Sequence, residues 1–157
     1  MVLRDAREAS VPRRAAGFTL IEIMAVVLII GLLTTIVGAV VFSQVDSARV
    51  TTASTQIKQI EAAMDFYRLD NGRYPSSEQG IEALVRRPTI APEPYNYRAE
   101  GYLHGGVVPK DPWGLPYQYE SPGSHNTYGF DLWSLGADGV PGGEDTDADI
   151  GNWAEES

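Results

Sequence analysis

The chain contains no cysteine. It can therefore form no disulfide bridge, and no thiolate can act as a nucleophile or as a soft metal ligand. Basic residues are missing from its last part: no Lys or Arg follows Lys110, whereas ten carboxylates lie between Asp111 and Glu156. Such an end repels nucleic acid and attracts cations. At 157 residues, the sequence has room for one small domain.

A long uncharged run, from Ile23 to Phe42, stands out near the start of the chain. At about 1.5 Å of rise per residue, it matches a hydrocarbon core of about 30 Å. Four arginines and two carboxylates lie in the first 17 residues, so the positive-inside rule keeps this part in the cytoplasm. We expect one membrane-spanning helix. A cleaved secretory signal is the alternative, although the run exceeds the usual apolar core of about 7–15 residues.

Glu22 places a charge at the start of this apolar segment. A carboxylate costs about 2.5–3.5 kcal/mol at the centre of a membrane and is normally retained for a partner or a function. If the chain were cut between Gly17 and Phe18, the new α-amino group of a neighbouring subunit could pair with Glu22. In the alternative, Glu22 lies at the level of the lipid headgroups, where its charge suits the positive end of the helix dipole.

The string Gly17-Phe-Thr-Leu-Ile-Glu-Ile23, which follows a short basic leader, resembles the prepilin signal of type IV pilins and pseudopilins. The resemblance implies cleavage after Gly17 by a prepilin peptidase and N-methylation of Phe18. It also implies a role for Glu22 in docking subunits. The expected organisation is a cleaved leader at 1–17, the transmembrane half of a long helix at 18–42 and an outer domain at 43–157.

Residues 43–70 are polar but compatible with a helix. Apolar side chains recur at steps of three and four residues and form one stripe: Ala53, Ile57, Ile60, Met64 and Tyr67. Asn71-Gly72 and Pro75 are helix-ending signals, so we expect a helix from about Phe18 to Asp70. The stripe is too short for a coiled coil and predicts that the outer half of the helix packs against a core.

Shorter elements follow the long helix. Ser76 to Gln79 has the pattern of a capping box and predicts a short helix that ends before Pro88. Segments 116–121 and 128–135 predict two strands joined by a hairpin connector. Side chains on one face of each strand are expected to be Tyr117 and Tyr119 in the first, and Tyr128, Phe130 and Leu132 in the second. The fold class is therefore α+β, with a long N-terminal helix packed against a small C-terminal antiparallel sheet.

A glycine-rich loop near the C-terminus carries five carboxylates and no basic residue: Asp138, Glu144, Asp145, Asp147 and Asp149. We call residues 135–149 the acidic loop. Its carboxylates repel one another unless they are solvated or bind a cation. Calcium, a hard ion that takes six to eight oxygen ligands, suits this set, whereas zinc is disfavoured because the loop has neither Cys nor His. A merely solvated acidic tail is the alternative.

An EF-hand is a second possible template for this loop. Four residues match its first, third, fifth and twelfth positions: Asp145, Asp147, Asp149 and Glu156. However, Ile150 occupies the position that requires glycine, and the chain ends before a second helix could form. This template is therefore disfavoured.

Five separate motifs resemble the major pseudopilin of type II secretion. In order they are LDNGRYP at 69–75, EQG at 78–80, DPWG at 111–114, SLGADG at 134–139 and DIGNW at 149–153. The resemblance implies a pilin-like fold and structural Ca²⁺. It implies side-chain ligands from Asp138, Asp147 and Asp149, and backbone carbonyl ligands from Leu135 and Val140.

The chain departs from the family pattern at two places. Ala148 lies where some members have a second adjacent carboxylate, so Asp145 remains an alternative to Asp147 as a ligand. Gly38-Ala39 stands where the family often has a proline that kinks the helix. Whether the helix of this chain is loosened at this point, as is usual in the family, therefore stays open.

The resemblance implies a structural subunit, not an enzyme, that polymerises into the periplasmic pseudopilus and so helps to export folded proteins. The subunit would cross the inner membrane once, with its N-terminus in the cytoplasm and its C-terminal domain in the periplasm. The implied partners are further copies of the chain, minor pseudopilins, a prepilin peptidase and methyltransferase, the inner-membrane assembly platform and the outer-membrane secretin channel.

Two other functions are disfavoured by the sequence. A surface type IV pilus, for adhesion, motility or DNA uptake, is disfavoured by the lack of a cysteine pair and by the calcium-like loop. A membrane-anchored, metal-dependent hydrolase is disfavoured because His104 and His125 belong to no catalytic motif, and neither HExxH nor GxSxG occurs.

Overall fold

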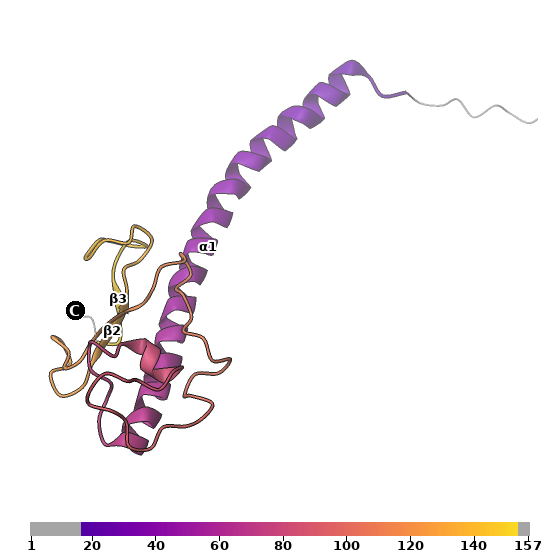
Figure 1. Ribbon diagram of the computed structural model, residues 1–157. Coiled ribbons are helices and arrows are strands. Elements are labelled where there is room, and N and C mark those ends of the chain that lie inside the picture. Colours follow the sequence, from indigo (N-terminus) through magenta and orange to yellow (C-terminus); the bar gives the residue numbers. More distant parts are fainter. Residues whose placement is uncertain (1–16, 154–157) are drawn as a thin grey trace, which may run out of the picture. The chain divides into compact units, whose positions relative to one another are not determined.

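The computed structural model of the chain describes residues 17–153, except for the side chains of residues 36–43 (Figure 1). The chain divides into unit 1, Met1–Val41, and unit 2, Phe42–Ser157. Helix α1, Leu20–Asn71, contributes its first part to unit 1 and its second part to unit 2. The expected leader, residues 1–17, lies outside the described residues except for Gly17.

In unit 1, α1 exposes nearly all of its large apolar side chains. From Leu20 to Leu33 these side chains have exposed fractions of 47–80%. Among the described residues, no helix has a stretch that is both long and apolar enough to cross a membrane. The expected span, residues 23–42, includes positions whose side chains lie outside the description, and it stays a prediction.

In unit 2, α1 buries the stripe expected from its periodicity. All five side chains from Ala53 to Tyr67 have exposed fractions of 2% or less. The helix ends at Asn71, one residue later than expected, because Gly72 adopts a positive φ of 75°. The N–H of Gly72 donates to the carbonyl oxygen of Arg68 at 2.7 Å, which satisfies one of the last free carbonyls of the helix.

The capping box expected after α1 is present. The N–H of Gln79 donates to Ser76 Oγ at 3.3 Å, and the N–H of Ser76 donates to Gln79 Oε1 at 3.1 Å. This reciprocal pair precedes a single turn of 3₁₀ helix, η1, at Ile81–Leu84. η1 buries Ile81, Ala83 and Leu84 in the core.

A three-stranded antiparallel sheet completes unit 2. Its strands are β1, Gln118–Glu120, β2, Asp131–Ser134, and β3, Ile150–Gly151, in the order β1-β2-β3. Tyr119 pairs with Leu132, and Ser134 pairs with Ile150. The antiparallel sheet expected from the sequence is confirmed. The sequence did not predict β3, because a strand of two residues is too short to show an alternating pattern.

The expected face of the second strand was wrong at one position. Phe130 and Leu132 are buried, whereas Tyr128 is fully exposed. The chain still turns at this point, because the N–H of Gly129 donates to the carbonyl oxygen of Asn126 at 2.8 Å. β2 therefore begins only at Asp131, and alternation cannot be extended back through the turn.

The core of unit 2 joins the α1 stripe to η1 and to the sheet. Helix residues Ile57, Ile60 and Met64 share one buried cluster with Leu84 of η1 and Leu132 of β2. Tyrosines line its edge, and the hydroxyl groups of Tyr74, Tyr102 and Tyr119 donate to polar partners, as those of buried tyrosines usually do, whereas the buried hydroxyl of Tyr97 has no partner. The sheet is thereby held against the outer half of the helix, and the acidic loop leads from β2 to β3.

Candidate functional site

The first candidate site is the start of α1. Gly17, Phe18 and Thr19 precede the helix, and both Phe18 and Glu22 are exposed. The N–H of Glu22 donates to Thr19 Oγ1 at 3.3 Å, and the N–H of Thr19 donates to Glu22 Oε2 at 3.4 Å. Thr19 and Glu22 therefore form a capping box, with Thr19 as the N-cap and Glu22 three residues later.

This geometry gives Glu22 a local partner that sequence reasoning missed. The signal was available, because Thr19 and Glu22 have the spacing of a capping box. Both contacts are long, so they leave the carboxylate free to accept a stronger partner at the same place. Capping of the helix by Glu22 is therefore compatible with the amine partner that the sequence predicts for this carboxylate.

The second candidate site is the acidic loop. Its glycines close the turn: Gly136 has a φ of 68°, and a Cβ placed on it would lie 2.6 Å from the carbonyl oxygen of Asp147. The N–H of Ala137 donates to the carbonyl oxygen of Thr146 at 3.0 Å, which ties the two arms of the loop together. Only glycine lets the backbone approach Asp147 this closely.

Asp149 is the inward-facing carboxylate of the loop. Its Oδ2 accepts a hydrogen bond from the N–H of Gly142 at 3.0 Å. Its Oδ1 is buried and has no hydrogen-bond partner. A buried oxygen without a partner is costly, so it calls for an ion or a water molecule. Asp149 has the chemistry of a cation ligand.

The other expected ligands are less closely gathered. Asp138 is exposed, and its Oδ1 accepts from the N–H of Val140 at 3.0 Å. Asp147 is also exposed, while Leu135 is half-buried. In the part of the chain that the structure describes, no group of three or more His, Cys, Asp or Glu side chains lies close enough to hold a metal ion. Glu156, the last EF-hand position, lies outside the described residues.

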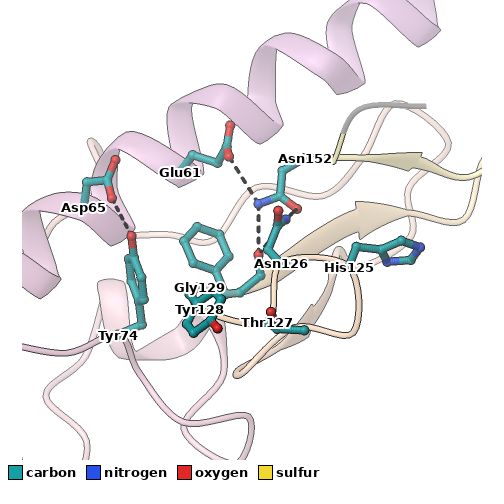
Figure 2. Close-up of a pocket in the computed structure, with 10 residues that line it drawn as sticks. Glu61, Asp65, Tyr74, His125, Asn126, Thr127, Tyr128, Gly129 and Asn152 are labelled. Atoms are coloured by element: carbon teal, nitrogen blue, oxygen red, sulfur yellow. Dashed lines mark hydrogen bonds between the residues drawn. The ribbon is translucent and has the colours of Figure 1, made fainter. Parts of the chain in front are cut away.

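A pocket of about 460 Å³ lies between α1 and the loop that joins β1 to β2 (Figure 2). Glu61 and Asp65, one helical turn apart on α1, line it. Asp65 Oδ1 accepts from the hydroxyl of Tyr74 at 2.8 Å, and Glu61 Oε1 accepts from the side-chain amide of Asn152 at 3.2 Å. Sequence reasoning missed this pocket, because its two walls lie more than fifty residues apart in the chain.

The side chain of Asn152, which lines this pocket, forms hydrogen bonds with several segments of the chain. Its side-chain amide donates to Glu61 and to the carbonyl oxygen of Phe130, the latter at 3.1 Å. Its Oδ1 accepts from the N–H of Leu132 at 3.0 Å and from the amide of Asn126 at 3.3 Å. One side chain thus joins the C-terminal segment to α1, to β2 and to the connector between β1 and β2.

Asp131 anchors the same connector. Its buried carboxylate accepts from the N–H groups of His125 and Asn126 at 2.7 and 2.9 Å, and from His125 Nδ1 at 3.0 Å. Burial raises the pKa of Asp131, but these hydrogen bonds lower the pKa more, so the pKa lies below its ordinary value. The His125 ring stacks on Trp153 with centroids 4.0 Å apart. These contacts give His125 a structural role, and none of its described contacts is with a nucleophile.

Comparison with known proteins identifies the family to which the chain belongs. The family model for type II secretion system protein G matches residues 40–153, and the model for the prokaryotic N-terminal methylation motif matches residues 12–38. Type II secretion system core protein G of Pseudomonas aeruginosa is 56% identical over 90% of this chain and 96% of its own length. The protein of the same name from Vibrio cholerae is 50% identical over 90% of this chain and 93% of its own length.

The fold agrees with a solved relative. The crystal structure of the major pseudopilin from the type 2 secretion system of enterohaemorrhagic Escherichia coli has a TM-score of 0.61 and 46% identity, and covers 71% of this chain and 92% of that one. The chain belongs to the type II secretion system protein G family. Members of this family are structural pseudopilin subunits and not known enzymes, and the pilin-like α+β fold expected from the sequence is confirmed.

Proposed function

We propose that this chain is the major pseudopilin of a type II secretion system, the subunit that polymerises into the periplasmic pseudopilus and helps to export folded proteins. The match of residues 40–153 to the protein G family carries this proposal. The exposed apolar side chains of unit 1 support it, because such a surface needs lipid or neighbouring helices around it. Its partners would be further copies of the chain, minor pseudopilins, the inner-membrane assembly platform and the outer-membrane secretin.

The N-terminal segment would be processed before assembly. The methylation motif at residues 12–38 supports cleavage between Gly17 and Phe18 and methylation of the new α-amino group. The helix after Phe18 would cross the inner membrane once and hold unit 2 in the periplasm. Glu22 would then receive the amine of a neighbouring subunit, which converts an unpaired carboxylate into an ion pair inside the apolar bundle.

Mass spectrometry of the protein extracted from membranes tests the processing. We expect a mature chain that begins with N-methylated Phe18, because a prepilin peptidase removes the leader after Gly17. A Gly17→Leu variant is the control, since blocked cleavage should leave the full leader and no methyl group. A wild-type N-terminus at any other residue would contradict the assignment of the leader.

We also propose that the acidic loop binds structural Ca²⁺. The donor set fits this ion: Asp149 offers a buried oxygen without a partner, and Asp138, Asp147 and the carbonyl groups of Leu135 and Val140 are oxygen donors of the kind that calcium prefers. Bound calcium would neutralise the carboxylates and draw the arms of the loop together. Asp145 is the alternative to Asp147, and its positive φ of 54° gives it an unusual backbone conformation.

Thermal unfolding of the detergent-solubilised protein tests the metal. At a calcium concentration of about 100 times the Kd, binding to the native state adds about 2.7 kcal/mol. We expect the melting midpoint to rise by about 10 °C over that in chelator, as this free energy implies for a domain of this size. Asp149→Ala should remove the rise, while Glu144→Ala, in the same loop but outside the proposed ligand set, should keep it. An equal midpoint in calcium and in chelator would exclude structural calcium.

A surface type IV pilus remains the second candidate for the filament, but no observation favours it. Residues 40–153 match the protein G family. Secretion of a reporter exoprotein in a strain that lacks its own major pseudopilin distinguishes the two. Restored secretion supports the proposed function, whereas surface filaments without secretion support a pilus.

A further inference from the structure

The end of α1 carries a second apolar surface, which faces away from the core. Phe66 and Leu69 have exposed fractions of 50% and 77%, while Met64 and Tyr67 on the other side of the helix are buried. Tyr95, in the loop after η1, is 83% exposed. We call Phe66, Leu69 and Tyr95, together with the arginines beside them, the aromatic patch. Exposed apolar surface rimmed by charge is typical of protein-binding sites.

Two guanidinium groups hold the rings of this patch in place. Arg98 lies 5.3 Å from the ring centroid of Phe66, and Arg73 lies 5.3 Å from that of Tyr95. Arg98 is neutralised by Asp70, with Nε and Oδ2 2.6 Å apart. Arg73 donates to the backbone oxygen of Glu93 and, within the described residues, forms no ion pair. Arg73, beside the exposed ring of Tyr95, is therefore a positive charge of this surface without an ion-pair partner among the described residues.

The acidic loop offers the complementary pattern. Its tip, Val140-Pro141, is exposed, and Val140 has an exposed fraction of 57%. Glu144, which lies outside the proposed calcium ligands, follows the tip and is exposed. No carboxylate of the loop forms an ion pair among the described residues, and no basic residue follows Lys110. The apolar tip of the loop suits the apolar side chains of the patch, and the negative charge beside the tip is opposite in sign to the positive charge beside the patch.

The two surfaces cannot meet within one subunit. In Figure 1 the acidic loop and the end of α1 lie at opposite ends of unit 2. A contact between them must therefore join two copies of the chain. Because the two surfaces differ, the contact is heterologous, and repeating it produces an open filament instead of a closed dimer.

We propose that the tip of the acidic loop in one subunit docks on the aromatic patch of a second copy of this chain. The inference rests on the proposed function, since it names an interface within the filament. Val140 and Pro141 pack on Leu69 and Tyr95, while Glu144 faces Arg73. Calcium in the acidic loop would set the position of the tip, which links metal binding to subunit contact.

Disulfide crosslinking of the full-length protein in filaments tests the contact. The chain has no cysteine, so Leu69→Cys with Val140→Cys introduces the only two thiols of each subunit, both at exposed positions. We expect a ladder of linked oligomers after mild oxidation, because each subunit uses both surfaces. The two single variants should give no linked dimer, which excludes links between two copies of residue 69 or two copies of residue 140 as the source of the ladder. Leu69→Cys with Val107→Cys is the matched control and should give no ladder, since Val107, with an exposed fraction of 70%, is at least as accessible as Val140.

Charge reversal is the second measurement. Arg73→Glu and Glu144→Arg should each lower the yield of filaments about tenfold, since like charges then face each other at the rim. The double variant should recover to within about threefold of the wild type. Recovery distinguishes a specific pair from a loss of folding, because misfolded single variants would not rescue each other.

The outcomes separate the interface from the function. Wild-type filaments without a ladder in the Leu69–Val140 cysteine pair, or without recovery in the double charge variant, overturn this interface and leave the proposed function intact. A ladder in the control pair, equal to that in the test pair, also overturns the interface. If the wild-type chain forms no filament in a strain with the complete secretion system, the proposed function fails and the interface fails with it.

Discussion

Glu22→Gln is expected to prevent filament assembly while leaving the start of α1 intact. Glutamine can replace glutamate in a capping box, so the contacts between Thr19 and residue 22 are kept. The negative charge, however, is lost, and the α-amino group of a neighbouring subunit would then have no partner in the apolar bundle. Breaking a buried ion pair costs about 3–5 kcal/mol, so the yield of filaments should fall by at least about a hundredfold. Electron microscopy and sedimentation measure this yield.

Thr19→Val is the matched control for this prediction. It removes the Oγ1 that accepts the N–H of Glu22 at 3.3 Å but keeps the carboxylate. Loss of an N-cap costs only about 1 kcal/mol, so filaments should persist at a reduced yield. Normal filaments in Glu22→Gln together with their loss in Thr19→Val would show that Glu22 acts through the cap and not through its charge.

Asn152→Ala is expected to destabilise unit 2 by about 3 kcal/mol. The substitution leaves the N–H of Leu132 without its partner at 3.0 Å. It also removes one of the two side-chain donors to the carbonyl oxygen of Phe130, at 3.1 Å, so that only the amide of Asn126 remains there. Each buried polar group that loses its partner costs about 1–3 kcal/mol. It also frees the connector between β1 and β2 from α1. Urea unfolding followed by tryptophan fluorescence measures the loss, since all three tryptophans lie in unit 2.

Asn96→Ala is the control for Asn152. Asn96 is exposed, and its contacts are made by its backbone N–H and carbonyl groups. Its substitution should change the free energy of unfolding by less than about 0.5 kcal/mol. A similar small change in Asn152→Ala would mean that water replaces the four side-chain hydrogen bonds at little cost.

Periodicity predicted the helix well, because burial along a helix repeats every three to four residues and leaves a clear pattern in the sequence. The stripe from Ala53 to Tyr67 is buried throughout, and the capping box at Ser76 forms as expected. The strands were predicted less well. β1 and β2 are three and four residues long, and β3 has two, so alternation has too few positions to mark where each strand begins.

The candidate sites divide in the same way. Glu22 and the carboxylates of the acidic loop could be named from local spacing, because their neighbours in the chain supply the context that makes them unusual. The pocket beside Glu61 could not, since Tyr74 and Asn152 reach it from distant segments. The aromatic patch was equally hidden, because exposure of Tyr95 and its contact with Arg73 depend on how the loop after η1 folds back on α1.

The amino-acid sequence by itself determined the class of this protein, through a basic N-terminal segment, the string from Gly17 to Ile23 with Glu22, the apolar run that follows and an acidic loop without basic residues. These features depend on residues that are close together in the chain. Only the tertiary structure decided that Asn152 joins three segments, that Asp149 keeps a buried oxygen without a partner and that the end of α1 exposes an aromatic surface. The reason is physical: hydrogen-bond satisfaction and side-chain exposure are set by packing between distant segments, and local spacing does not contain them.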